Sequence, residues 1–148
     1  MGFENEQTLL RASQTDDVAG FHTRYDKALD EVQDELGETH PIFIDGKEIS
    51  VSSTFADRSP SNTDLLLGRF QKAGGEEAGR AVKAALQAFP DWAATDWHDR
   101  VAIFRRSAEL LAGDKYPLAA LMTHENGKNR AEAMADVDEA IDLIRWYA

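Results

Sequence analysis

The chain has 148 residues, a formal net charge of −11 and no cysteine. This length is enough for a domain with a buried core, and an apolar fraction of 43% is compatible with folding. The absence of cysteine excludes disulfides, cysteine-ligated zinc and a cysteine nucleophile on this chain. The acidic balance disfavours nucleic acids and membranes as partners, because a negative surface repels phosphate groups.

Nothing in the sequence predicts a membrane span or an export signal. No run of about 18 apolar residues is present, which a membrane-spanning helix would need. The first residues lack the basic region followed by an apolar one that marks a signal peptide. A cytoplasmic location is therefore the default expectation.

Residues 1–38 are expected to form an N-terminal helical extension ahead of a second region, residues 39–148. Apolar residues three or four apart predict one amphipathic helix over residues 16–36, with Gly37 as its C-terminal cap. Its apolar stripe consists of Phe21, Tyr25, Leu29, Val32 and Leu36.

Short strands are predicted next, beginning with an antiparallel hairpin. Asp45-Gly46 stands between two β-rich runs and indicates a type I′ turn, which needs positive φ at both central positions. The predicted strands are residues 42–44, 47–51, 54–57 and 65–72.

Four helices with short connections are expected to complete an α+β chain. The first begins after Gly74-Gly75 and is expected to end at Pro90, and residues 91–96 should connect it to the next helix. Its apolar stripe, expected to face a core, consists of Ala78, Val82, Ala85, Leu86 and Phe89. Since strands and helices do not alternate, no complete nucleotide-binding sheet is predicted.

The last predicted helix, residues 130–148, carries a core stripe and a dense set of carboxylates. The stripe consists of Met134, Val137, Ile141 and Ile144. Like-charged pairs four residues apart are destabilising unless a cation offsets them. Arg145 can partner Asp142 in this way, and Lys128 can reach Glu132. Two interpretations stay open: a solvated acidic face, or one carboxylate in a cleft that holds a cationic group. The four histidines are scattered and predict no metal site.

Several segments, in order, resemble the N-terminal part of aldehyde dehydrogenases. They are residues 41–47 (PIFIDGK), 84–92 (AALQAFPDW), 125–129 (ENGKN) and 136–142 (DVDEAID). Within that family, the helical extension before the hairpin resembles the 1-pyrroline-5-carboxylate dehydrogenase branch. The last helix still follows its pattern at the final residue, without a Gly, Pro or Asn that closes it, which also predicts a piece of a longer chain.

The resemblance implies the first part of an NAD-binding domain without its Rossmann core, in an enzyme that oxidises L-glutamate 5-semialdehyde during proline catabolism. The family's cysteine nucleophile, catalytic glutamate and Pro-Trp-Asn cofactor motifs are absent, so the chain is expected to be inactive alone and not to bind NAD itself. The remainder of the enzyme is then its partner, in a homo-oligomer when complete. The resemblance also implies that Glu139 lies near the amino end of the substrate, where a carboxylate suits an ammonium group.

The alternative is a non-catalytic helical interaction module, or a remnant that pairs with another chain. Such a module should bury Ile141, Ile144, Trp146 and Tyr147 within itself, whereas a fragment should expose them, because their packing partners lie downstream. A third interpretation, an acidic mimic that binds a basic partner, depends on charge alone.

Overall fold

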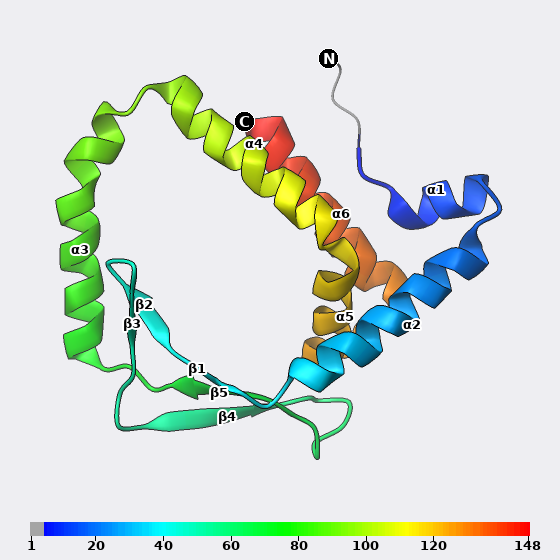
Figure 1. Cartoon of the computed structure of the whole chain (residues 1–148), viewed down its shortest axis with the longest axis horizontal. Helices are drawn as coiled ribbons and strands as arrows, with labels where there is room; N and C mark the ends of the chain where they lie inside the picture. The colour runs from blue at the N-terminus through cyan, green and yellow to red at the C-terminus, as the bar shows by residue number, and fades with distance from the viewer. Residues whose placement is uncertain (1–4) are drawn as a thin grey trace. The chain divides into compact units, whose positions relative to one another are not determined.

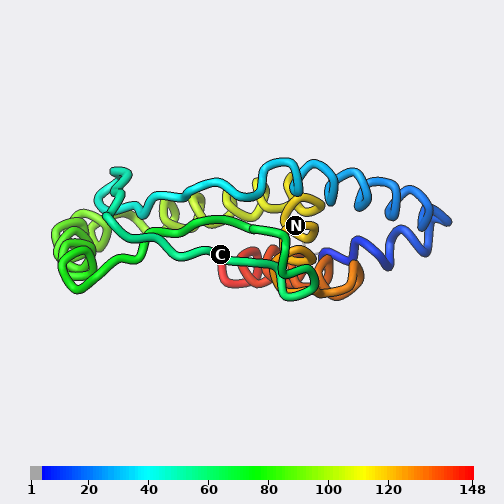
Figure 2. Tube along the Cα trace, turned by 90° about the horizontal axis from the view of Figure 1, so that it is seen from below, coloured from blue at the N-terminus to red at the C-terminus, as the bar shows by residue number. Residues whose placement is uncertain are grey.

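The computed structural model describes residues 5–148, so residues 1–4, part of the predicted extension, lie outside the description. The chain forms two compact units, one made of residues up to 35 together with 97–148, the other of residues 36–96. The first is entirely helical, and the second contains all the strands and one helix (Figures 1 and 2).

The helical unit is built around a core shared by helices from both ends of the chain. Its helices are α1 (Thr8–Gln14), α2 (Val18–Glu35), α4 (Trp97–Gly113), α5 (Lys115–Asn126) and α6 (Arg130–Tyr147). Helix α5 packs against α2 and α6, while α6 also packs against α4 and α1. The predicted helix over residues 16–36 is confirmed as α2, and the last predicted helix as α6. The sequence did not predict α1.

The core of this unit combines large side chains with alanines. Phe21, Tyr25, Met134 and Ile141 are fully buried. Ala108, Ala119 and Ala133 are also fully buried, and residues this small let helix backbones approach closely. The buried hydroxyl of Tyr25 donates a hydrogen bond of 2.9 Å to the Ala119 carbonyl, so no polar atom there is left without a partner.

The strand unit contains a two-stranded hairpin and a three-stranded sheet. Its strands are β1 (Thr39–His40), β2 (Ile42–Ile44), β3 (Lys47–Ile49), β4 (Thr54–Arg58) and β5 (Leu66–Gln71). The hairpin pairs β2 with β3, and the predicted turn is confirmed, since Asp45 and Gly46 have φ of +55° and +69°. The sheet has the order β1-β5-β4.

The structure contains one strand pairing that the sequence does not predict. Strand β4 pairs antiparallel with β5, but β1 pairs parallel with β5, with Thr39 opposite Arg69. A two-residue strand with a partner thirty positions away leaves no pattern in the local sequence. The unit is therefore a mixed sheet beside a hairpin, and the side chain of buried Gln71 links the two by accepting a 2.8 Å bond from the Val51 amide.

Helix α3 (Gly75–Ala94) corrects two predictions. Pro90 does not end it but lies inside it, and most of the expected connecting segment, residues 91–94, is helical. Proline keeps a helical φ but removes one intrahelical hydrogen bond, that to the carbonyl four residues earlier. Pro90 and Leu86 are both exposed, so water can satisfy that carbonyl.

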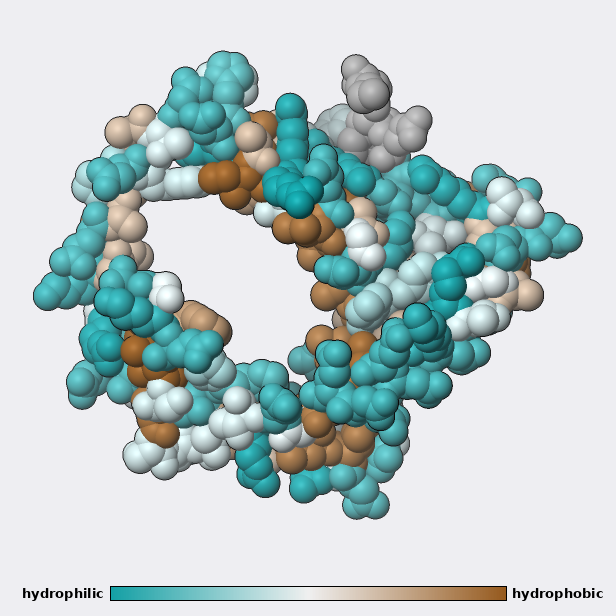
Figure 3. Space-filling model, viewed as in Figure 1, coloured by the Kyte–Doolittle hydropathy of each residue, from teal (hydrophilic) through white to brown (hydrophobic). Residues whose placement is uncertain are grey.

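The expected core stripe of α3 is not covered within this chain. Val82, Leu86 and Phe89 are 61%, 68% and 63% exposed, and no residue of α3 is buried. A similar surface follows α4, where hydrophobic side chains are visible in Figure 3 and Ile103, Phe104 and Leu110 are each more than half exposed. Within residues 5–148, no helix is both long enough and apolar enough to cross a membrane.

Candidate functional site on helix α6

Helix α6 begins at a well-defined cap. Gly127 ends α5 in the left-handed region at φ +76°, where glycine carries no steric penalty. The Asn129 side chain then accepts hydrogen bonds of 3.0 Å from the amides of Ala131 and Glu132. These bonds satisfy two of the amides that a helix start leaves without intrahelical partners.

The predicted core stripe of α6 is confirmed, and it includes one carboxylate that the sequence analysis did not place there. Met134, Val137 and Ile141 are buried. Asp138 is also buried, with only 6% of its surface exposed. It lies four residues after Met134 and three before Ile141, so the spacing alone could have placed it in the stripe. The fully solvated acidic face is therefore wrong for this residue.

Residues at the start of the described chain satisfy the buried Asp138. The amide and the hydroxyl of Thr8 donate to its two carboxylate oxygens at 2.7 and 2.8 Å. The ammonium of Lys115 lies 3.8 Å from the same carboxylate and donates to the Thr8 hydroxyl at 2.9 Å. A buried charge is tolerated when it is paired and hydrogen-bonded in this way.

Glu6 makes a second set of contacts one helical turn further along. Its carboxylate accepts from Lys115 at 2.8 Å and from Arg145 at 2.5 Å, and its amide donates to both oxygens of Asp142, at 2.8 and 2.9 Å. Partial burial raises the pKa of the Glu6 carboxyl, but the bonds from Lys115 and Arg145 outweigh it and hold this pKa below its ordinary value of 4.5.

Two predicted ion pairs on α6 are therefore wrong. Arg145 pairs with Glu6 and not with Asp142, and Lys128 pairs with Asp136 and not with Glu132. The contacts of Glu6 with Arg145 and Asp142 join residues more than 100 positions apart in sequence, so no rule based on local spacing could predict them.

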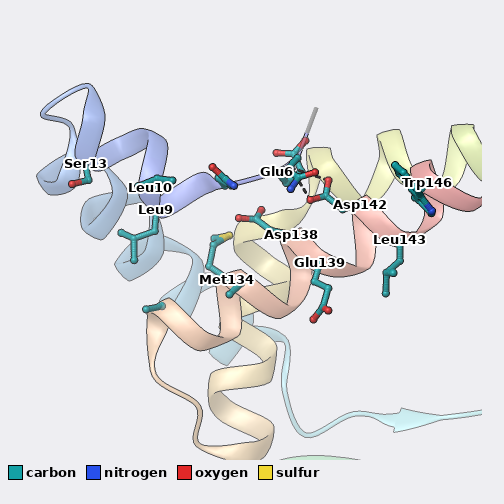
Figure 4. Close-up of a pocket in the computed structure, with 14 residues that line it drawn as sticks. Glu6, Leu9, Leu10, Ser13, Met134, Asp138, Glu139, Asp142, Leu143 and Trp146 are labelled. Atoms are coloured by element: carbon teal, nitrogen blue, oxygen red, sulfur yellow. Dashed lines mark hydrogen bonds between the residues drawn. The ribbon is translucent and has the colours of Figure 1, made fainter. Parts of the chain in front are cut away.

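Glu139 lies on a different side of α6 from these pairs. Figure 4 shows Asp138 and Asp142 directed toward Glu6, while Glu139 and Leu143 extend away from it. Glu139 is exposed, and among residues 5–148 its carboxylate has no hydrogen bond or ion pair. It lines a groove of about 760 Å³ beside α1 and α6, whose other residues are Asn5, Glu6, Gln7, Leu9, Leu10, Ser13, Ala131, Met134, Ala135, Asp138, Asp142, Leu143 and Trp146.

The start of α3 does not suit a phosphate group. The Gly74 amide, at the start of α3, already donates to the Glu77 carboxylate at 2.8 Å, and Glu76 lies beside it. These charges oppose a phosphate there. Hydrogen bonds from backbone amides also hold the pKa of Glu77 below its ordinary value. Residues 5–148 contain no group of three or more His, Asp or Glu placed to hold a metal ion.

The burial of four residues at the end of α6 is expected to distinguish a fragment from a self-contained module, and the four do not behave alike. Ile141 is fully buried and Ile144 packs partly buried against the core, so the expectation that a fragment exposes all four is wrong. Trp146 and Tyr147 are 65% and 82% exposed. The core of the helical unit is thus closed as far as Ile144, and the last two aromatic side chains lie outside it.

Comparison with known proteins decides the family. The family model described as the aldehyde dehydrogenase family matches residues 48–148, about two thirds of the chain. The chain belongs to the aldehyde dehydrogenase family. The resemblance read from the sequence is thereby confirmed.

Named relatives of this aldehyde dehydrogenase chain point to one branch. It is 36% identical over 125 residues to 1-pyrroline-5-carboxylate dehydrogenase of Staphylococcus haemolyticus, and 37% over 124 residues to that of Bacillus pumilus. Each match covers 84% of this chain and 24% of the relative. The chain therefore spans about a quarter of the length of the curated relatives that it matches.

Solved structures extend the match to nearly the whole fold. A Thermus 1-pyrroline-5-carboxylate dehydrogenase with bound NAD is 34% identical, with a TM-score of 0.88 over 99% of this chain and 28% of that one. Proline utilization A from Bdellovibrio bacteriovorus is 32% identical, with a TM-score of 0.90 over 99% of this chain and 15% of that one. The α+β fold is thus that of the N-terminal part of 1-pyrroline-5-carboxylate dehydrogenase structures.

Proposed function

We propose that this chain is the N-terminal part of an NAD-dependent dehydrogenase that oxidises L-glutamate 5-semialdehyde to glutamate in proline catabolism. The observation that carries the proposal is the match of nearly the entire fold to 1-pyrroline-5-carboxylate dehydrogenases at 34% identity. The predicted division into an extension, residues 1–38, and a dehydrogenase segment, residues 39–148, belongs to this proposal, as do the homo-oligomer and the cytoplasmic location.

The chemistry requires groups that this chain does not supply. A thiolate adds to the aldehyde, hydride leaves to NAD, and water releases the resulting thioester as a carboxylate. The chain has no cysteine, and its only Gly-Gly pair carries a carboxylate where a phosphate would bind. The chain alone is therefore inactive in this proposal, and the nucleophile and the NAD site belong to the rest of the enzyme.

Glu139 is the residue through which this chain would contact the substrate. Its carboxylate is exposed and has no partner among residues 5–148, whereas Asp136, Asp138 and Asp142 are each engaged. The α-ammonium of L-glutamate 5-semialdehyde carries the complementary charge, and the hydrogen bond between them would be charge-assisted. Glu139 thus serves to orient the substrate and takes no part in bond making.

The test begins with the coding sequence beyond Ala148. We expect an in-frame continuation with a cysteine-containing segment and a glycine-rich nucleotide site, and the complete protein should oxidise the semialdehyde with NAD. In that protein, Glu139→Gln should raise KM about tenfold or more, because the ammonium loses a charged acceptor. Glu132→Gln, at another exposed carboxylate of α6, is the matched control. Oxidation of the semialdehyde by the 148-residue chain unaided would refute the proposal that the nucleophile and the NAD site belong to the rest of the enzyme. An unchanged KM in Glu139→Gln would refute the role of Glu139.

The non-catalytic interaction module is the second candidate, and the burial of Ile141 favours it. A unit that closes its own core can exist as a separate binding protein. A stop codon after Ala148, with no related frame downstream, would support this candidate and exclude catalysis.

A further inference from the structure

The N-terminal segment makes an unusual number of polar contacts for so few residues. Glu6 and Thr8 together contact Lys115 at the start of α5 and three residues along α6, which are Asp138, Asp142 and Arg145. The side chain of Glu6 is only 12% exposed and that of Asp138 only 8%. Contacts removed from water in this way are screened less by solvent than surface pairs.

Because of these and neighbouring contacts, the carboxylates in the middle of α6 differ in whether they have a partner. Asp138 is occupied by Thr8 and Lys115, Asp142 by the Glu6 amide, and Asp136 by Lys128. Glu139, between them in sequence, extends to the other side of the helix and keeps its carboxylate unoccupied among residues 5–148 (Figure 4).

We infer that Glu6 and Thr8 are positioning residues for Glu139: by holding Asp138 and Asp142 against the N-terminal segment, they reinforce the rotation of α6 that its buried stripe sets, and leave Glu139 as the acceptor for a substrate ammonium. The inference deepens the proposed function and depends on it. Successive residues on a helix are turned by about 100°, so contacts at positions 138 and 142 set the direction of position 139.

Chemical labelling of the 148-residue chain tests the arrangement directly. A water-soluble carbodiimide with glycinamide as nucleophile modifies accessible carboxylates, and peptide mass spectrometry locates the product. We expect Glu139 and Glu132 to react at similar rates and Asp138 and Asp142 to react at least about tenfold more slowly. Equal rates at Asp138 and Glu139 in the unaltered chain would overturn the inference.

Two variants connect the protection to the N-terminal segment. Thr8→Val removes the hydroxyl donor to Asp138, and Glu6→Gln removes the charge that holds Lys115 and Arg145. Thr8→Val should increase labelling of Asp138 several-fold, and Thr8→Ser should restore its protection. Glu6→Gln, which loosens the segment whose amide holds Asp142, should increase labelling of Asp142 several-fold. Matched controls are Thr23→Val and Glu31→Gln, at exposed positions of α2 whose side chains bond to other residues of α2. Unchanged labelling in both folded variants would overturn the inference.

Kinetics of the complete enzyme separate positioning from stability. Thr8→Val and Glu6→Gln should raise KM for the semialdehyde by roughly threefold to tenfold with little change in kcat, measured well below the unfolding temperature. If Glu139→Gln raises KM but these variants do not, the contacts are purely structural and the inference fails alone. If Glu139→Gln leaves KM unchanged, the proposed substrate contact fails, whatever the labelling shows.

Discussion

The two units of this chain differ in how they use their apolar residues. The helical unit encloses Phe21, Tyr25, Met134 and Ile141 completely, although Ile103, Phe104 and Leu110 on its helix α4 are more than half exposed. The strand unit has no such closed set on its helix, since Val82, Leu86 and Phe89 of α3 are mostly exposed and no residue of α3 is buried. Both sets follow the same helical spacing. Periodicity therefore shows which face of a helix is apolar, but not whether the covering surface is part of the same chain.

The difference fits a chain that spans about a quarter of its relatives. A unit whose core is assembled from helices at both ends of the chain can close by itself. A helix such as α3, with no buried residue and a long apolar face, needs another surface to cover it. Stability should then reside mainly in the helical unit, and four experiments test this contrast.

The same substitution in the two units should give the largest contrast. Phe21→Ala removes a ring that packs against Tyr25 and Tyr116 in the closed core, and should lower the free energy of unfolding by about 3–5 kcal/mol. Phe89→Ala, at a position 63% exposed, should change it by less than about 0.5 kcal/mol. Urea unfolding followed by far-UV circular dichroism measures both. Similar losses would show that α3 is covered in solution.

Removing a buried carboxylate from the helical unit should lower the free energy of unfolding somewhat less than Phe21→Ala does. Asp138→Ala leaves the amide of Thr8 without its acceptor and removes a charge 3.8 Å from Lys115, and should lower the free energy of unfolding by about 2–3 kcal/mol. Asp26→Ala breaks an exposed pair with Arg130 and should cost less than about 1 kcal/mol. If the two variants unfold at the same denaturant concentration, Asp138 is not buried as described.

In the strand unit, a substitution in the hairpin turn should lower stability through the backbone conformation, without the loss of a side chain contact. Gly46→Ala places a Cβ at φ +69° and should cost about 1 kcal/mol, although no atom lies near the added group. Gly75→Ala, equally open but at the start of α3, should be neutral or slightly stabilising. Amide exchange of the hairpin strands gives the local measurement. An equal response at both glycines would contradict the type I′ turn.

The smallest expected effect is a pH dependence confined to the N-terminal segment. Because the pKa of Glu6 is lowered in the folded state, its contribution is fully present above 4.5, its ordinary value, and is lost as the pH falls through the folded pKa. Thermal unfolding between pH 3 and 6 should therefore show a slope in this acid range that Glu6→Gln reduces. A slope that Glu6→Gln leaves intact would assign it to other carboxylates.

Local pattern was sufficient for much of this fold. Apolar spacing predicted α2 and α6, and Asp45-Gly46 predicted the hairpin turn, because these features depend on residues a few positions apart. The polar, seven-residue α1 and the two-residue β1 were missed, since each is stabilised by a distant partner. The sequence predicts a helix end at Pro90, whereas α3 continues to Ala94, because an exposed helix tolerates the lost bond.

The candidate site was harder to predict than the fold. The position of Asp138 in the apolar stripe could have been read from its spacing to Met134 and Ile141. Its partners could not, because Glu6 and Thr8 lie more than 100 residues away. Glu139 stays a prediction from family resemblance, and its exposure is compatible with the proposed contact without testing it.

The tryptophans give this chain a built-in optical property. All three, Trp92, Trp97 and Trp146, are exposed, by 42%, 57% and 65%. Indole rings in water already emit at long wavelength, so unfolding of the isolated chain should shift its fluorescence very little. Binding of the remaining part of the enzyme, or of any partner that covers α3, α4 and the end of α6, should move the emission to shorter wavelength. The intrinsic fluorescence would then report assembly and not folding.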